Sequence, residues 1–179
     1  MRSLQSCATL LALALGLCLL DGSAQAGVNP QMQTALWAQQ KLRFDYTGFT
    51  THYSCDGLVA RIHQVLGKLQ ARNGFRVMPA GCDDGRPVPL PSVDIELAAL
   101  RPSNAPGAIR AVWKPVSLGG TQGLQGADCE LAEEIVQKIL PLFQVRNVRM
   151  NTTCTPHQMP TGPVSLTLEV LAPAPPLRP

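Results

Sequence analysis

The sequence predicts an α+β fold in which a β-α-β-β unit occurs twice, with both helices packed on one face of a mostly antiparallel sheet, in a ferredoxin-like style. The first observation behind this prediction is a weak internal repeat, because residues 92–102 align with residues 163–173. Both segments alternate apolar and polar side chains, as a half-buried strand does. The second observation is that a helical apolar pattern and an extended segment precede each of them in the same order. We therefore place the two units at about residues 44–102 and 108–173.

The first unit is expected to begin with an extended segment at about residues 47–54, followed by a helix at about residues 55–72. Ser54 suits the N-cap of this helix, because its hydroxyl can accept a free backbone N–H of the first turn. Apolar side chains recur at helical spacing and form one buried stripe, made of Leu58, Ile62, Val65, Leu66 and Leu69. Strands at residues 75–81 and 92–102 complete the unit.

The second unit repeats this order with a strand at residues 109–118 and a helix at residues 127–140. Its helical stripe consists of Leu131, Ile135, Ile139 and Leu142. Pro141 limits how far the helix continues, because proline has no backbone N–H to donate. Strands at residues 145–153 and 163–173 follow and complete the predicted sheet.

The two units form one domain, at residues 27–171, and a tail at residues 172–179 follows it. The tail contains four prolines and is expected to be disordered. An additional helix is expected at residues 31–43, with Met32, Ala35, Leu36 and Leu42 on one face.

Residues 1–26 have the three parts of a cleavable secretion signal. Arg2 is followed by an apolar run at residues 7–20, which is shorter than the roughly 20 residues that a bilayer span needs. Ala24-Gln25-Ala26 has the small side chains that signal peptidase requires, so we place the cut after Ala26. A lipoprotein signal ending at Cys18 fits less well, because the preceding residue is a bulky leucine. The mature chain is therefore predicted to be periplasmic or secreted, with no membrane span.

Four cysteines remain after the signal is removed, and these are Cys55, Cys82, Cys129 and Cys154. In an exported chain they imply two disulfides, for which the count alone allows three connectivities. The predicted helix of about 16 residues is about 24 Å long, and the strand that runs back along it covers about 25 Å. The end of each strand then returns to the start of its helix, which predicts the pairs Cys55–Cys82 and Cys129–Cys154.

The predicted strands show polar side chains on the face opposite the apolar one. These side chains belong to Asp94, Glu96, Asn147, Arg149, Ser165, Thr167 and Glu169. This face of the sheet is therefore expected either to be solvated or to contact a partner.

Candidate chemistry is sparse, and the sequence predicts no catalytic, cofactor-binding or metal-binding residues. His52 lies near Cys55 and could activate a thiolate, but a disulfide at Cys55 is favoured in an oxidising compartment. His157 and Met159, with Met150 nearby, could bind a soft metal ion, but a site needs three or four converging ligands. A histidine in a loop and packing methionines are the favoured interpretation.

The formal net charge is only +3, and basic and acidic residues are interspersed. This balance disfavours a surface dedicated to nucleic acid. The sequence leaves open whether the partner is another protein or a small ligand.

Three stretches carry a resemblance to a known group of proteins. They are YTGFTTHYSCDGL at residues 46–58, VWKPV at residues 112–116 and NTTCTPH at residues 151–157. These stretches resemble those of an uncharacterised family of secreted proteins from proteobacteria, and the likeness runs through most of the mature chain. The resemblance implies a bacterial periplasmic setting, and it implies no activity and no site residues.

The leading hypothesis from the sequence is an exported soluble accessory or binding protein of the bacterial envelope. It would act through the polar face of the sheet or through the loops. The alternative is a small periplasmic enzyme or metal-binding protein that uses His52 and His157. An enzyme is the less favoured of the two.

Overall fold

The computed structural model describes residues 32–81, 89–120, 123–151 and 162–176, and it has an α+β fold with a six-stranded antiparallel sheet and two helices. The main elements in chain order are β1 (Met32–Asp45), α1 (Cys55–Lys68), β2 (Arg76–Ala80), β3 (Ser92–Pro102), β4 (Ile109–Ser117), α2 (Cys129–Glu134), β5 (Val145–Asn151) and β6 (Ser165–Pro173). The predicted fold class is confirmed at this level.

The strands lie in the order β2-β3-β1-β4-β6-β5, and every neighbouring pair is antiparallel. β3 lies between β1 and β2, so the connection through α1 crosses over β3. In the same way β6 lies between β4 and β5, and the connection through α2 crosses over β6. β1 and β4 pair only along Met32–Ala35 and Ile109–Val112, so a short seam joins two three-stranded halves.

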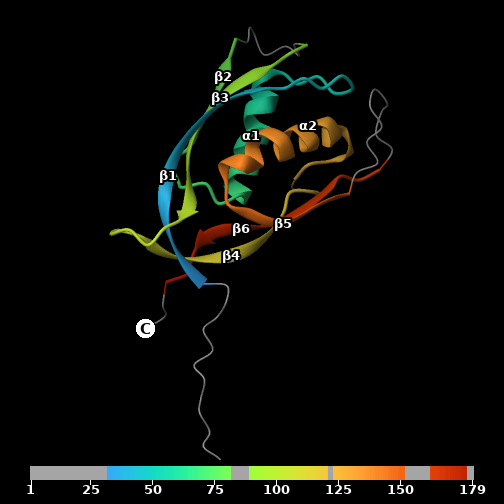
Figure 1. The fold of residues 1–179 in the computed structure, drawn as a ribbon. Helices are drawn as coiled ribbons and strands as arrows, with labels where there is room; N and C mark the ends of the chain where they lie inside the picture. The colour runs from blue at the N-terminus through green and yellow to red at the C-terminus, as the bar shows by residue number, and fades with distance from the viewer. Residues whose placement is uncertain (1–31, 82–88, 121–122, 152–161, 177–179) are drawn as a thin grey trace, which may run out of the picture.

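Both helices lie on the concave side of the curved sheet, with β1 and β3 along one flank and β4 and β6 below them (Figure 1). The side chains between the helices and the sheet form one apolar core. The predicted stripes of both helices belong to it, including Leu58, Ile62, Leu66, Leu131 and Ile135, each of them fully buried. Burial of this shared core is the main favourable contribution to folding.

α1 starts where the sequence predicts, because the Ser54 hydroxyl accepts the backbone N–H of Gly57 at 3.1 Å. It ends at Lys68 and not at residue 72. Gln70 takes a left-handed backbone with φ of 61°, and the Arg72 N–H donates to the carbonyl of Ala98 in β3 at 2.9 Å. The chain has therefore left the helix and runs beside the sheet before β2 begins.

The second helical segment is irregular over its whole length. A 3₁₀ turn at Gly126–Asp128 leads into α2, a π turn follows at Ile135–Ile139, and a 3₁₀ turn at Leu140–Leu142 ends it. Regular α-helix ends at Glu134, earlier than predicted, but the helical segment as a whole ends near the predicted position, because Pro141 lies in its last turn and has no N–H to donate.

Two of the predicted elements are wrong. The helix expected at residues 31–43 is part of β1, which pairs with β3 from Ala35 to Asp45. In the second half of β1, apolar and charged side chains alternate strictly. Leu42 and Phe44 pack on the helix side, and charged residues lie between them. The strand expected at residues 47–54 is irregular apart from a bridge residue at Ser54, because its backbone N–H groups donate to carboxylates of α2 and not to a strand.

The remaining bounds agree closely with the prediction. β3 occupies the predicted residues, and β2, β4 and β6 are one or two residues shorter than expected. Ala172 and Pro173 fall in both the strand expected at residues 163–173 and the tail expected at residues 172–179. They belong to β6, and the next residue donates its N–H to the carbonyl of Arg110 at 2.9 Å. The predicted polar strand residues are all half-buried or exposed, as a solvated face requires.

Replacing Leu66 by alanine tests the core. Leu66 is fully buried, so the change should lower the free energy of unfolding by about 3 kcal/mol, because it removes buried methyl groups and leaves a cavity. Urea denaturation measures this difference. Leu90→Ala is the matched control, since Leu90 is 65% exposed and should change the free energy by less than about 0.5 kcal/mol. Equal effects of the two variants would contradict the assigned core.

Candidate binding surface

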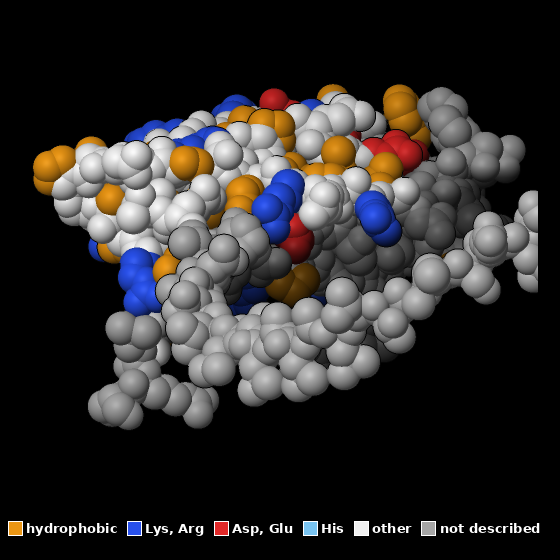
Figure 2. All heavy atoms as spheres, turned by 60° about the horizontal axis from the view of Figure 1, so that its bottom comes forward, with side chains coloured by type: hydrophobic (Ala, Val, Ile, Leu, Met, Phe, Trp, Pro, Cys, Tyr) orange, Lys and Arg blue, Asp and Glu red, His pale blue; other side chains and the backbone are white. Residues whose placement is uncertain are grey.

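The face of the sheet that points away from both helices is called the outer face below. Its side chains are mostly polar and are partly paired with each other. Lys41 contacts Glu96 at 2.6 Å, and Arg43 lies 3.8 Å from Asp94. The hydrogen bond from Lys41 holds the pKa of Glu96 below its usual value. Seen from below the sheet of Figure 1, apolar side chains are scattered among basic and uncharged ones (Figure 2).

A small apolar cluster interrupts this polar face where β1 and β4 meet. Its members are Ala35, Trp37, Leu100, Ile109, Ala111, Trp113 and Leu171. The alanines and leucines in it are at most 3% exposed, whereas both tryptophans are only half-buried. The two tryptophans of the chain therefore lie in one cluster on the outer face, one on each side of the seam.

Each tryptophan is covered by an arginine. The guanidinium of Arg146, on β5, lies 4.4 Å from the ring centroid of Trp113, and that of Arg72 lies 5.8 Å from the ring centroid of Trp37. A cation over an indole face is attracted by the negative potential of the ring. The two contacts fix the position of both arginines relative to the sheet.

The arginine on β5 also holds a carboxylate. Arg146 Nε donates to Glu169 Oε2 at 2.6 Å, and the side-chain amide of Asn147 donates to the same oxygen at 2.8 Å. Both hydrogen bonds lower the pKa of Glu169, and the bond from Arg146 has the larger effect. The Arg146–Asn147 pair is therefore an anion site whose occupant is a residue of the same chain.

The arginine that follows α1 borders two open hollows. One, of about 470 Å³, is lined by Gln39, Arg72, Asn73, Gly74, Phe75, Arg76, Glu96, Leu97 and Ala98. The other, of about 390 Å³, is lined by Trp37, Gly67, Gln70, Ala71, Arg72, Asn73, Phe75 and Pro173. The two hollows share Arg72, Asn73 and Phe75, and volumes in this range suit small ligands.

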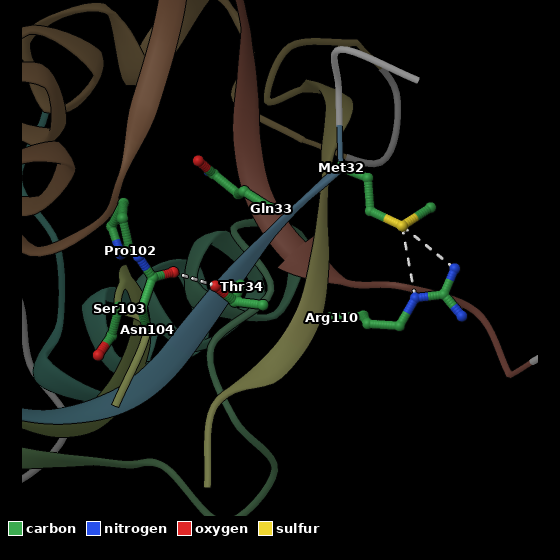
Figure 3. A pocket seen from close by; sticks show the side chains of 7 residues that line it. All are labelled: Met32, Gln33, Thr34, Pro102, Ser103, Asn104 and Arg110. Carbon is green, nitrogen blue, oxygen red and sulfur yellow. Dashed lines mark hydrogen bonds between the residues drawn. The ribbon is translucent and has the colours of Figure 1, made fainter. Parts of the chain in front are cut away.

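A further hollow of about 600 Å³ lies at the start of β1 (Figure 3). Most of its polar groups bond to each other, since Thr34 Oγ1 donates to Asn104 at 2.7 Å and Arg110 donates to the sulfur of Met32. The side-chain nitrogen of Gln33 is buried and has no hydrogen-bond partner among the residues that the structure describes. Figure 3 shows Gln33 on the other side of β1 from the contact between Met32 and Arg110, so these groups do not converge on one point.

A second polar network lies on the helix side, between the segment at residues 46–53 and the start of α2. Glu130 Oε2 accepts the backbone N–H of Phe49, and the N–H and hydroxyl of Thr50, each at 2.9 Å. Burial alone would raise the pKa of Glu130, but the hydrogen bonds from Thr50 and Phe49 outweigh it and lower that pKa. Glu134 accepts both the N–H and the hydroxyl of Thr47, at 2.8 and 2.5 Å.

Asp128 extends this network to α1. It accepts a short hydrogen bond from the Tyr53 hydroxyl and the N–H of Gln125 at 2.8 Å, and Arg61 of α1 lies 3.4 Å from it. Burial has the largest effect on the pKa of Tyr53 and raises it, and the hydrogen bond to Asp128 raises it further. The Tyr53 hydroxyl therefore stays protonated. Asp128 is 2% exposed and its acceptors are occupied, so this network holds the fold together and does not present a reactive group.

Of the residues proposed from the sequence, the structure describes His52, Cys55 and Cys129. His52 is exposed on the segment before α1, and Cys55 is buried at the first position of that helix. Cys129 is buried at the first position of α2. Cys82, Cys154, His157 and Met159 lie outside the described residues. Within those residues, no three His, Cys, Asp or Glu side chains lie close enough to hold a metal ion.

Sequence reasoning missed the arginine–tryptophan pairs, although the sequence contains their signal. Ala-x-Trp occurs at residues 35–37 and 111–113, and Gln-x-Arg-Asn occurs at residues 70–73 and 144–147. The first repeat lies in the first strand of each half, and the second follows each helix. Neither motif is recognisable without knowing that the two segments come together on one face.

Comparison with known proteins finds no family, curated protein or solved structure that matches this chain. Among the helices of the described residues, none has the length and apolar character that crossing a membrane requires.

Glu130→Gln tests the helix-side network. The pKa of Glu130 is lowered in the folded protein, so its charge stabilises the fold above about pH 4.3, the usual pKa of a glutamate. This stabilisation is lost as the pH falls through the lowered pKa. At pH 7 the variant should lose about 2 kcal/mol of unfolding free energy, and the difference from the original protein should shrink in acid. Thermal and urea unfolding between pH 7 and pH 3 measure the difference in unfolding free energy between the variant and the original protein.

Glu133→Gln is the matched control, because Glu133 is on the same helix and makes no hydrogen bond or ion pair with the described residues. It should change stability by less than about 0.5 kcal/mol at any of these pH values. A pH-independent loss in Glu130→Gln would show that packing, and not the carboxylate charge, is what matters at that position.

Proposed function

We propose that this chain is an exported accessory or binding protein of the bacterial envelope, and that it binds its partner through the outer face of the sheet. The observation that carries the proposal is the pair of open hollows around Arg72, which are lined by polar groups and by the aromatic residues Trp37 and Phe75. Hollows of this kind, with a few converging polar groups, are typical of binding sites. The secretion signal at residues 1–26 supports the envelope setting.

We also propose that the scaffold is a duplicated β-α-β-β unit. The strand order supports this, because β2-β3-β1 in one half is mirrored by β4-β6-β5 in the other. Side chains at aligned positions of β3 and β6 also share an environment, since Ile95 and Leu166 both lie in the main core, and Leu100 and Leu171 both lie in the outer cluster.

The proposed bridges Cys55–Cys82 and Cys129–Cys154 would close each unit. Cys55 and Cys129 are the first residues of their helices and are buried, which supports two bridges. Cys82 comes shortly after the end of β2 and Cys154 shortly after the end of β5, as the helix-and-return geometry requires. The pairing itself remains a prediction.

Native mass spectrometry of the protein expressed with its own signal and extracted from the periplasm tests the proposed function. We expect a chain cut after Ala26 that retains a noncovalently bound molecule or a second chain. A protein without any bound species that turns over a substrate would overturn the proposal. A bound metal ion that His157→Ala abolishes would instead support the alternative based on His52 and His157.

Peptide mapping without reduction tests the bridges. Digestion between the cysteines should release one linked pair containing Cys55 with Cys82 and another containing Cys129 with Cys154. The intact mass should be lower by four hydrogens than that of the reduced chain. A linkage between the halves, such as Cys55 with Cys154, would contradict the duplicated unit with its own bridge.

A further inference from the structure

We infer that Arg72 and Asn73 form a binding site for the carboxylate group of a small external ligand. This inference deepens the proposed binding function and rests on it, because it names the chemistry that the outer face recognises. It comes from comparing the two halves of the sheet, where the same pair of residues has a carboxylate partner in one half and an open hollow in the other.

The two sites correspond residue by residue. Arg72-Asn73 and Arg146-Asn147 are the ends of the two Gln-x-Arg-Asn motifs, and each arginine covers the tryptophan of its own half. In the second half Arg146 lies opposite Glu169 in the strand register. In the first half Arg72 lies beside Ala98, to which its N–H donates at 2.9 Å.

The partner residue is where the halves differ. When residues 92–102 are aligned with residues 163–173, Ala98 takes the position of Glu169. The carboxylate that fills the second site is therefore absent from the first, and Ala98 lines the hollow of about 470 Å³ there. Among the described residues, Arg72 makes no ion pair, and its contact with Trp37 leaves its charge uncompensated.

The charges around the hollow favour an anion. Arg76 also lines it, and within the described residues its side chain makes no hydrogen bond or ion pair. Glu96 is the acidic residue of the lining, but Lys41 contacts it at 2.6 Å and compensates its charge. Two guanidinium groups and one paired carboxylate leave the hollow with an excess of positive charge.

Carboxylate is the ligand group that this geometry indicates. In the second half one carboxylate oxygen accepts from both the guanidinium and the amide, at 2.6 and 2.8 Å, and bonds of this kind to an ionised group are among the strongest in proteins. Trp37 borders the adjoining hollow of about 390 Å³ and provides an apolar wall for the body of a small molecule. Phe75 lines both hollows, and its ring also packs on His63 of α1, with the ring centroids 4.6 Å apart.

Titration of the ¹⁵N-labelled mature chain with glutarate, followed by NMR of the arginine Nε–H and asparagine amide signals, tests the inference. We expect saturable binding of one glutarate per chain, with shifts at Arg72 and Asn73. Arg72→Gln should weaken binding at least about tenfold, because it removes the charged donor. Glutaramide, the neutral diamide, should not bind, and inorganic phosphate should bind more weakly than glutarate.

Exchanging the partner residue between the halves gives the sharpest comparison. Ala98→Glu should supply an internal carboxylate and abolish glutarate binding, while Glu169→Ala should free Arg146 and Asn147 and raise the stoichiometry from one glutarate to two. Circular dichroism and unfolding of each variant show whether it folds. Arg146→Gln is the matched control for Arg72→Gln and should leave glutarate binding at Arg72 unchanged.

Three results would overturn the inference: no saturable glutarate binding, equal binding of phosphate, or binding to Ala98→Glu that equals that of the original chain. Any of these would leave the proposed function standing if native mass spectrometry still finds a retained partner. A different outcome is also informative: glutarate binds at Arg72, but native mass spectrometry finds no molecule or second chain bound to the protein from the periplasm. This outcome would support the site and count against the proposed function as an accessory or binding protein.

Discussion

Three carboxylates at the start of the second helical segment, from Asp128, Glu130 and Glu134, hold the two halves of the molecule together on the helix side. They accept the N–H and hydroxyl donors of residues 46–53, which follow β1 and are not part of the sheet. The Tyr53 hydroxyl is buried and the donors of Thr47 and Thr50 are partly buried, and a buried donor without an acceptor costs about 1–3 kcal/mol. The position of α2 and the path of this segment therefore depend on each other. Lys138 strengthens the contact, because it bonds both Glu134 and the carbonyl of Asp45.

This contact matters because the sheet alone joins the halves weakly. Among the described residues, β1 and β4 pair only along the short seam from Met32 to Ala35. On the outer face the tryptophan cluster covers the seam, with Ala35 and Ala111 fully buried in it. The helix-side network and the outer cluster thus close the interface between the halves from opposite faces of the sheet.

The proposed correspondence of the halves makes one chemical difference between them informative. An arginine, an asparagine and a tryptophan occur at matching places, yet the position that carries Glu169 in the second half carries Ala98 in the first. The second arginine is neutralised within the chain, whereas the first faces an open hollow. A stabilising ion pair in one half and a recognition site in the other can therefore arise from the same scaffold.

Periodicity and local signals in the sequence determined the α+β class, the start of α1 at Ser54 and the full extent of β3, because these depend on contacts between near neighbours and on alternation along one strand. Tertiary structure alone decided the rest. β1 has enough apolar residues to be read as a helix, and only pairing with β3 makes it a strand. The segment at residues 47–54 was expected to be extended, but its backbone donors are taken by carboxylates about eighty residues away in the sequence. The site at Arg72 was likewise invisible, because Trp37, Arg72 and Ala98 come from separate segments that meet only when the sheet has formed.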